Sequence, residues 1–217
     1  MSETTPRTPR RDALRNRAAI VDSACTAFAE RGLDAPLEPI AAAAGVGNAT
    51  LYRHFPERAA LWEAVLQAPL REVLDLVQEC LVISEDDPWA GFATFIRRTA
   101  DIEARREGFS ELMTTRFTGA PTLLALRAEI QDGLESLFRR AQDAGAIRAD
   151  AALEDVAVVQ LSMARTIETF GEVAPELHRR WVDLVLDGLR APGAQREPLG
   201  GPPLRPNQIW RAVMRRR

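Results

Sequence analysis

The apolar residues of this 217-residue chain recur three and four positions apart over almost the whole stretch from Asp12 to Arg190, without convincing strand-like alternation. This spacing places apolar side chains on one face of each successive helix. Glycine and proline divide the stretch into about nine segments, and 46 % hydrophobic residues are enough to form a sizeable core. We therefore predict an all-α globular fold of about nine helices.

One short segment, residues 45–55, combines a turn with a polar helix. It reads Gly-Val-Gly-Asn-Ala-Thr-Leu-Tyr-Arg-His-Phe and follows a short alanine-rich helix. Gly45 stands where a left-handed residue ends a helix, and two short helices joined by a glycine turn make a helix-turn-helix. Leu51 and Phe55 are four residues apart and can pack inward, which leaves the polar residues outside. Such a helix can reach the phosphates and base edges of a nucleic acid.

The stretch from Arg17 to Leu66 resembles the DNA-binding domain of TetR-family transcriptional regulators. The motifs that carry the resemblance are Ala27-Phe28-Ala29-Glu30-Arg31-Gly32, Ile40-Ala41, Ala44-Gly45-Val46 and Thr50-Leu51-Tyr52-Arg53-His54-Phe55-Pro56, followed by Leu61. The resemblance implies a DNA-binding regulator rather than an enzyme. It implies an N-terminal three-helix helix-turn-helix domain and a C-terminal helical bundle for ligand binding and dimerisation.

The domain boundaries predicted on this basis divide the chain into four parts. They are a basic disordered arm at residues 1–11, the DNA-binding domain at 12–66, the ligand-binding and dimerisation domain at 67–190, and a Pro/Gly linker with a basic tail at 191–217. Proline inside a helix removes a hydrogen bond, so Pro69 is expected to kink the helix that joins the two domains. Disorder is the simpler reading of the tail, and an accessory contact with DNA or a partner is the alternative.

The resemblance also implies which residues contact DNA. Arg53 is expected at base edges, where it can hold guanine in bidentate fashion, and Arg58 at a phosphate beside the first amides of its helix. The alternative for His54 is a ring packed under the turn. The full predicted set of DNA-binding residues is Asn48, Ala49, Thr50, Tyr52, Arg53, His54, Arg58, Arg15 and Arg17.

Two positions depart from the family pattern. The segment Leu33–Pro39 lacks the hydroxyl residue that usually caps the second helix, so Asp34 is the expected cap. Gly47 replaces the usual serine before the recognition helix, which either shifts the cap to Asn48 or leaves it weak. A capping Asn48 would be less free to read a base.

All 28 basic side chains counted as lysine plus arginine are arginines, since the chain has no lysine. With abundant alanine, this composition is typical of a GC-rich genome such as that of an actinobacterium. Although the net charge is -3, the segment from Arg7 to Arg17 holds five arginines and one acid. It is either an arm that follows DNA into the minor groove or a solvated leader.

The helices beyond residue 67 carry many large apolar residues, which favours a pocket for a small apolar or amphipathic effector. A filled core is the alternative use of each aromatic residue. No cofactor is expected, and the effector itself stays unknown. The predicted pocket residues are Trp89, Phe92, Phe95, Thr99, Phe109, Met113, Arg116, Phe117, Gln160, Met163, Thr166, Ile167 and Phe170.

A single helix-turn-helix reads only a few base pairs, so two heads about one helical turn apart are expected on a near-palindromic operator. The last two long helices are the predicted homodimer interface, as part of a four-helix bundle. The alternative is that their second apolar faces cover the chain's own core. The predicted interface residues are Val158, Leu161, Arg165, Trp181, Val182, Val185 and Leu186.

The rest of the sequence limits where the protein acts and what it can catalyse. Cys25 and Cys80 fall on apolar stripes and are expected to be buried thiols in a reducing cytoplasm. No apolar run is long enough to span a membrane. His54 and His178 are the only histidines, and no spacing suits a metal site or a catalytic triad.

The interpretation that best fits these features is a sequence-specific DNA-binding transcriptional regulator, expected to be a ligand-released repressor. Three other classes remain open from the sequence. They are a helical ligand-binding protein that has lost DNA binding, a helix-bundle enzyme, and a protein adaptor. Salt-dependent binding to a specific DNA sequence separates the first interpretation from these three.

Overall fold

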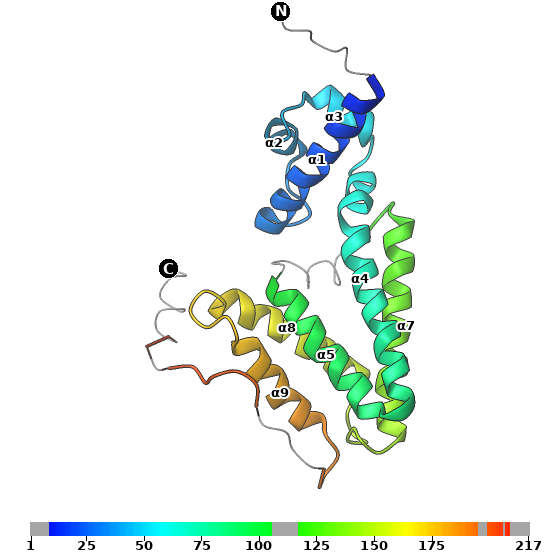
Figure 1. Ribbon diagram of the computed structural model, residues 1–217, viewed down its shortest axis with the longest axis vertical. Helices are drawn as coiled ribbons and strands as arrows, with labels where there is room; N and C mark the ends of the chain where they lie inside the picture. The colour runs from blue at the N-terminus through cyan, green and yellow to red at the C-terminus, as the bar shows by residue number, and fades with distance from the viewer. Residues whose placement is uncertain (1–8, 106–116, 195–198, 206, 209–217) are drawn as a thin grey trace, which may run out of the picture. The chain divides into compact units, whose positions relative to one another are not determined.

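A computed structural model describes residues 9–105, 117–194, 199–205, 207 and 208. Over these residues the chain forms eight α-helices (Figure 1). Their bounds are α1 Pro9–Arg31, α2 Leu37–Ala43, α3 Asn48–His54, α4 Arg58–Asp86, α5 Pro88–Arg105, α7 Pro121–Asp143, α8 Leu153–Phe170 and α9 Leu177–Leu189. The all-α prediction is confirmed. The sequence pattern also predicts a short helix over residues 109–117, one of the nine expected, and this range falls almost wholly outside the described residues.

The first helix starts earlier than the sequence predicts. It begins at Pro9 rather than at Asp12, so residues 9–11 belong to α1 and not to an arm. Proline is tolerated in the first turn of a helix because the amide it lacks would have no partner there. The arm predicted at residues 1–11 is therefore too long, and its first eight residues lie outside the described part.

The chain divides into two compact units. The first unit runs to Pro69 and includes residues 117–124, whereas the second begins at Leu70 and continues from Ala125. Residues 117–124 join the first unit because the ring of Phe117 lies edge-on to Trp62, with 6.0 Å between ring centroids. The amide of Thr122 also donates to Oε1 of Glu63 at 3.0 Å. Helix α4 runs unbroken through Pro69, at the boundary between the units.

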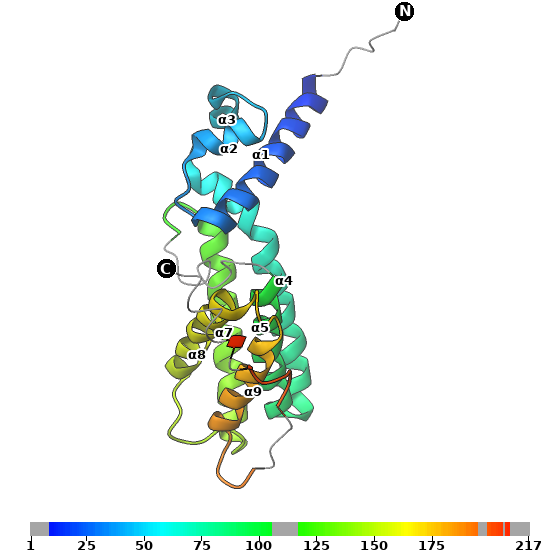
Figure 2. The ribbon, with the colours of Figure 1, turned by 90° about the vertical axis from the view of Figure 1, so that its left-hand side faces the viewer.

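The first unit has its own core. Helices α1, α2 and α3 lie together (Figure 2), and Ile20, Ile40 and Leu51 from these three helices are at most 1 % exposed. The indole of Trp62 adds a buried hydrogen bond of 3.1 Å from Nε1 to the carbonyl oxygen of Leu33. The apolar residues of α3 pack into this core, and the polar residues of α3 are left on the outside.

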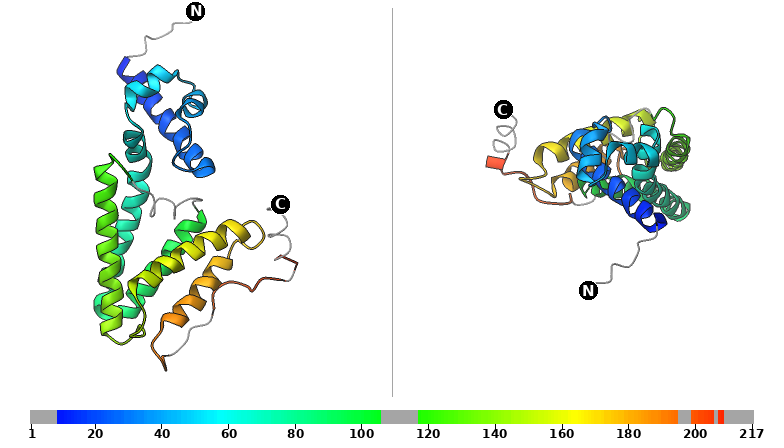
Figure 3. Two further views of the ribbon diagram at one scale, coloured as in Figure 1. Left: turned by 180° about the vertical axis from the view of Figure 1, so that it is seen from behind. Right: turned by 90° about the horizontal axis from the view of Figure 1, so that it is seen from above.

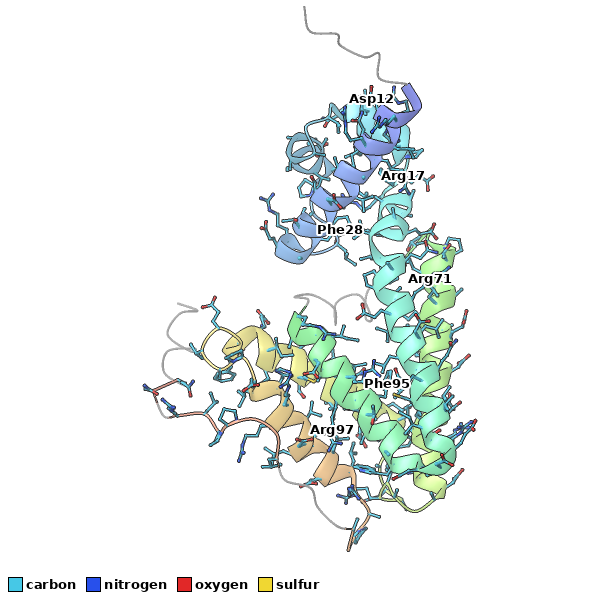
Figure 4. All side chains as sticks on the ribbon, in the orientation of Figure 1. Asp12, Arg17, Phe28, Arg71, Phe95 and Arg97 are labelled. Atoms are coloured by element: carbon cyan, nitrogen blue, oxygen red, sulfur yellow. The ribbon has the colours of Figure 1, made fainter. Side chains whose placement is uncertain are left out.

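The second unit packs α5 against α8 and α9 (Figure 3). In α5, whose residues Phe95 and Arg97 are labelled in Figure 4, Arg97 donates from Nε to Oδ1 of Asp183 in α9 at 2.9 Å. The rings of Phe92 and Phe138 meet edge-on at 5.9 Å, which joins α5 to α7. Apolar packing and a partly buried ion pair thus hold this unit together.

A segment of the predicted linker and tail lies along α9. The amide of Gly200 donates to Oδ2 of Asp183 at 2.7 Å, and Nε2 of Gln208 donates to the carbonyl oxygen of Val173 at 2.5 Å. Gly201 has a positive φ of 65°, and a Cβ at this position would lie 2.7 Å from the carbonyl oxygen of Glu176. Gly200, Gly201 and Gln208 are therefore attached to the second unit rather than separate from it.

No helix in the described part of the chain has the length and apolar character needed to cross a membrane. Of the two cysteines, Cys80 is fully buried, as predicted. Cys25 is exposed, which corrects the prediction that both thiols are buried. The stripe on α1 that carries Cys25 is thus only partly covered by the neighbouring helices.

Candidate functional site

The turn between α2 and α3 has the geometry that its glycine predicts. Gly45 adopts a φ of +68°, its amide donates to the carbonyl oxygen of Ala42 at 3.1 Å, and the amide of Val46 donates to that of Ala41 at 3.0 Å. These bonds satisfy the last carbonyls of α2 and end it. The turn leads directly into α3 and completes a helix-turn-helix.

Helix α3 presents a polar row to solvent. Leu51 is fully buried and Phe55, just after the helix, is 2 % exposed, so these two residues anchor it. Tyr52 is 46 % exposed, Arg53, Asn48 and Ala49 are exposed, and Thr50 is partly exposed. The structure therefore brings the predicted reading residues to one surface. They supply hydroxyl, amide and guanidinium groups that suit phosphates and base edges.

Neither helix of the motif has a side-chain cap. The N-cap of α3 is Gly47, in extended conformation, so Asn48 lies within the helix and is not used as the cap. The N-cap of α2 is Pro36, also without a capping side chain. The expectation that Asp34 caps α2 is wrong, because Pro36 occupies the N-cap position and no side chain makes a capping hydrogen bond there.

Arg58 is turned toward the protein. Its Nη1 donates to the carbonyl oxygens of Leu33 at 3.0 Å and Ala35 at 2.7 Å. The side chain is partly buried, and these bonds tie the start of α4 to the loop before α2. The sequence predicted a phosphate contact for Arg58, but in this structure the guanidinium holds the loop instead.

The other predicted basic residues, Arg17, Arg15 and His54, have different surroundings. The guanidinium of Arg17 lies 5.1 Å from the centre of the Phe55 ring, a favourable cation–π distance. Arg15 is exposed and pairs with Asp12 at 3.3 Å. The ring of His54 is partly buried, with an Nε2 that has no hydrogen-bond partner among the described residues. The partial burial of His54 therefore fits the alternative prediction, in which its ring packs under the turn.

The second unit contains a cavity of about 290 Å³ between α4, α5, α7 and α8. Phe95, Thr99, Gln160 and Met163 were predicted from the sequence, and the structure places all four in its wall. Leu161, predicted for the dimer interface, also lines it. The remaining lining residues were not predicted from the sequence; they are Val73, Glu103, Arg127, Ile130, Gln131, Leu134, Leu153, Glu154 and Ala157.

The polar groups of the cavity come from three helices. Glu103 on α5 is only 5 % exposed, Arg127 and Gln131 lie on α7, and Gln160 lies on α8. The hydroxyl of Thr99 donates back to the carbonyl oxygens of Phe95 and Ile96 at 2.9 and 3.0 Å. The spacing of Phe95, Thr99 and Glu103, four residues each, could have identified the buried acid as part of this wall.

Several residues predicted for the pocket lie elsewhere. Trp89 and Phe92 pack in the core, where the guanidinium of Arg190 lies 4.2 Å from the centre of the Trp89 ring. Phe117 belongs to the first unit, against Trp62. The remaining residues are not in the wall: Thr166, Ile167 and Phe170 lie on α8 outside the lining, whereas Phe109, Met113 and Arg116 lie outside the described residues.

The predicted interface residues divide into an exposed and a buried group. Val158 is 65 % exposed, Leu161 50 % and Trp181 38 %, Arg165 is exposed, and Val185 is partly buried. Val182 and Leu186 are at most 1 % exposed. These two residues pack in the chain's own core and are removed from the predicted interface. Leu184 on α9, which is not in the predicted set, is 46 % exposed.

The described residues contain no cluster of three or more histidine, cysteine or acidic side chains able to hold a metal ion. What the fold and the exposed helix define is a DNA-binding protein of the helix-turn-helix class. It carries a second helical unit that contains a cavity.

Comparison with known proteins agrees with this class. A model of the tetR family of bacterial regulatory proteins matches residues 20–65. A model of the C-terminal domain of SbtR-like transcriptional regulators matches residues 87–191. The chain belongs to the TetR family of transcriptional regulators, which are DNA-binding proteins and not enzymes.

Three solved structures illustrate the relationship. A TetR transcriptional regulator from Streptomyces coelicolor is 34 % identical, over 82 % of this chain and 99 % of its own, with a TM-score of 0.46. The regulator PfmR from Thermus thermophilus is 22 % identical over 79 % and 98 %, with a TM-score of 0.58. RolR in complex with resorcinol is 18 % identical over 88 % and 100 %, with a TM-score of 0.52. Comparison with curated proteins gave no match.

Proposed function

We propose that this TetR-family regulator is a repressor that binds a near-palindromic operator as a homodimer. A small apolar or amphipathic molecule releases it from DNA. The observation that carries the proposal is the exposed row of α3, where Asn48, Ala49, Tyr52 and Arg53 face solvent above a buried anchor. Operator DNA lies on the chromosome, so the protein acts in the cytoplasm.

In the proposed complex, α3 enters the major groove. Arg53 and Asn48 reach base edges, Ala49 and the methyl of Thr50 offer apolar contact to thymine, and Tyr52 holds the phosphate backbone. Arg15 lies exposed on α1 and adds a phosphate contact. Arg17, over Phe55, supplies a second contact at the edge of α3. Arg58 is left out of this group, because its Nη1 bonds the loop carbonyls.

The homodimer rests on exposed apolar residues of α8 and α9. Val158 and Leu161 on α8 and Trp181 and Leu184 on α9 are between 38 and 65 % exposed. Large exposed apolar residues gathered on adjacent helices mark an interaction surface. Two copies that join these helices form a four-helix bundle and carry two α3 helices to one operator.

The cavity of the second unit is the proposed effector site. Its apolar wall, which includes Phe95, Ile130 and Met163, suits a hydrocarbon or aromatic body. Glu103 and Arg127 provide an acceptor and a donor for a polar end. RolR, which shares the fold, was solved with the small diphenol resorcinol. An effector that binds better to the form unable to hold DNA shifts the population away from the operator.

Selection of binding sites from a random DNA pool, followed by titration at increasing salt, tests the proposal. We expect a near-palindromic consensus, and a log K that falls with log salt by about 0.9 for each phosphate contact. Arg53→Ala should relax base preference at a cost of about 1 to 3 kcal/mol. Arg71→Ala, at an exposed arginine of α4, is the matched control. A flat salt response with no consensus would refute the proposal.

A further inference from the structure

The most deeply buried polar groups in the cavity wall are hydrogen-bond acceptors. Thr99 and Glu103 lie one helical turn apart on α5, both line the cavity, and they are 3 % and 5 % exposed. The hydroxyl hydrogen of Thr99 is used within the helix, where Oγ1 donates to the carbonyl oxygens of Phe95 and Ile96. The lone pairs of this hydroxyl remain, and an ionised carboxylate such as that of Glu103 accepts only. This side of the cavity therefore favours a ligand group that donates.

The charged side chains among the described lining residues differ in burial. They are the carboxylates of Glu103 and Glu154 and the guanidinium of Arg127. Glu154 is exposed and Arg127 is partly exposed, so water and salt weaken the field of both. Glu103 is buried, and a charge acts more strongly where the effective dielectric constant is low. The field on the buried side of the cavity is therefore set mainly by a carboxylate.

Apolar residues surround these acceptors. Phe95, Ile130 and Met163 line the same cavity and are at most 2 % exposed. In such surroundings a polar group of the ligand that finds no partner in the wall costs binding free energy. A cavity of about 290 Å³ is also at the lower end of the range for ligand pockets, which favours a small molecule. The wall therefore selects by both size and hydrogen-bonding type.

We propose that the effector is a small amine, with an apolar body and a primary ammonium group, and that Glu103 is the residue that selects it. An ammonium group has three donors and no acceptor, and its bonds to a carboxylate are charge-assisted. A ligand with a carboxylate end brings a like charge to Glu103 and is rejected. The inference rests on the proposed function, because it takes this cavity as the effector site, and it adds the chemical class of the effector.

Three probes of similar shape and different charge test the selection. They are phenethylamine, which is cationic, phenethyl alcohol, which is neutral, and phenylacetate, which is anionic. Isothermal titration calorimetry on the full chain without DNA gives the dissociation constant of each probe. The wild type should bind phenethylamine at least about tenfold more tightly than phenylacetate, because only the cation gains a charge-assisted bond to Glu103.

Variants that keep the shape of the wall separate Glu103 from the other acid. Glu103→Gln should weaken phenethylamine by about tenfold, strengthen phenylacetate, and change phenethyl alcohol by less than about threefold. Glu154→Gln removes an exposed charge from the same wall and is the matched control, expected to leave all three constants within about twofold. Thr99→Val removes the second acceptor and should weaken phenethylamine several-fold without weakening phenylacetate. It provides the test if Glu103→Gln does not fold.

The inference is overturned if the wild type does not bind phenethylamine, or binds phenylacetate equally well. It is also overturned if Glu103→Gln, or Thr99→Val in its place, keeps the wild-type preference. An equal effect of Glu154→Gln and Glu103→Gln counts against it as well, because the preference would then come from general negative charge. If the protein binds phenethylamine as expected but is not released from operator DNA, only the proposed function is refuted, since none of these titrations contains DNA.

Discussion

The imidazole of His178 lies with Nε2 2.9 Å from Oδ1 of Asp101, which joins the start of α9 to α5. The ring is 5 % exposed, and its Nδ1 lies 2.9 Å from the carbonyl oxygen of Pro175. Arg179 adds a bond of 3.0 Å from Nε to the same Asp101 oxygen. Burial raises the pKa of the Asp101 carboxyl, but the bonds from His178 and Arg179 outweigh it and hold the pKa below its ordinary value.

Asp101→Ala should therefore destabilise the second unit by about 1 to 2 kcal/mol at pH 7, because it leaves Nε2 of the buried His178 ring without its partner. The folded-state pKa lies below the unfolded one, so this contribution is complete above about pH 5. It is lost as the pH falls below about 4, through the folded-state pKa. Urea unfolding across this range should show wild type and variant converging in acid.

Asp150→Ala is the control for Asp101→Ala. The pKa of Asp150 is also lowered, mainly by the hydrogen bond from Arg148, but this pair is exposed to solvent. Its removal should change the unfolding free energy much less. If the two variants behave alike, or if the difference between wild type and Asp101→Ala persists unchanged in acid, the Asp101–His178 contact is not a stabilising one.

The second prediction concerns Arg58. Removal of its guanidinium leaves the carbonyl of the buried Ala35 without a donor, so Arg58→Ala should cost about 1.5 to 3 kcal/mol in the absence of DNA. Arg53→Ala, at an exposed site, should change stability by less than about 0.5 kcal/mol. Thermal unfolding of both proteins without DNA provides the measurement. Equal stability would return Arg58 to the group of phosphate contacts.

Local patterns were enough to predict the helix-turn-helix. The apolar spacing of a helix and the glycine that ends α2 depend on neighbouring residues only. Gly45 has the positive φ that this helix end requires. The direction of Arg58 could not be predicted in this way. Its partners, Leu33 and Ala35, come from a loop more than twenty residues earlier in the chain, and a surface arginine can face a phosphate or a carbonyl equally well.

The second unit was predicted less completely, because tertiary packing decides which face of a helix is covered. Val182 and Leu186 lie on an apolar stripe of α9, and the sequence does not show whether that stripe meets its own chain or a partner. Glu103 and Arg127 were missed since charged residues are normally expected at the surface. They line the cavity only because α5, α7 and α8 converge around it.

The third prediction tests the packing of α5 on α4. A Cβ on Gly91 would lie 2.6 Å from Cβ of Ser84 and 2.7 Å from the carbonyl oxygen of Cys80. Gly91→Ala must therefore push the helices apart, and should cost about 1 to 3 kcal/mol. Gly188→Ala, on α9 with no atom within 4 Å of the added Cβ, should instead stabilise by about 0.5 to 1 kcal/mol. If Gly91→Ala and Gly188→Ala changed the free energy of unfolding in the same direction, this packing would be contradicted.

The fourth prediction concerns the two thiols. Burial raises the pKa of Cys80 to about 11, while Arg98 lowers it and Glu79 raises it slightly. At pH 8 only about one Cys80 thiol in a thousand is then ionised, and the thiolate is the reactive form. Titration of the native protein with a disulfide reagent should detect one fast thiol, Cys25. Denatured protein should show two, and native Cys25→Ser should show none.

The last prediction concerns the segment that follows α9. Gly201 has a φ of +65°, and an added Cβ would lie 2.7 Å from the carbonyl oxygen of Glu176. Gly201→Ala should therefore detach the segment around Gly200 and Gly201, because an alanine disfavours the positive φ and its Cβ collides with the Glu176 carbonyl oxygen. Limited proteolysis should cut this segment several-fold faster than in wild type. Gly193→Ala is the control, since it also has a positive φ, of 86°, but no atom within 4 Å of the added Cβ. Equal cleavage of Gly201→Ala and wild type would show that the contact with Glu176 does not hold the segment.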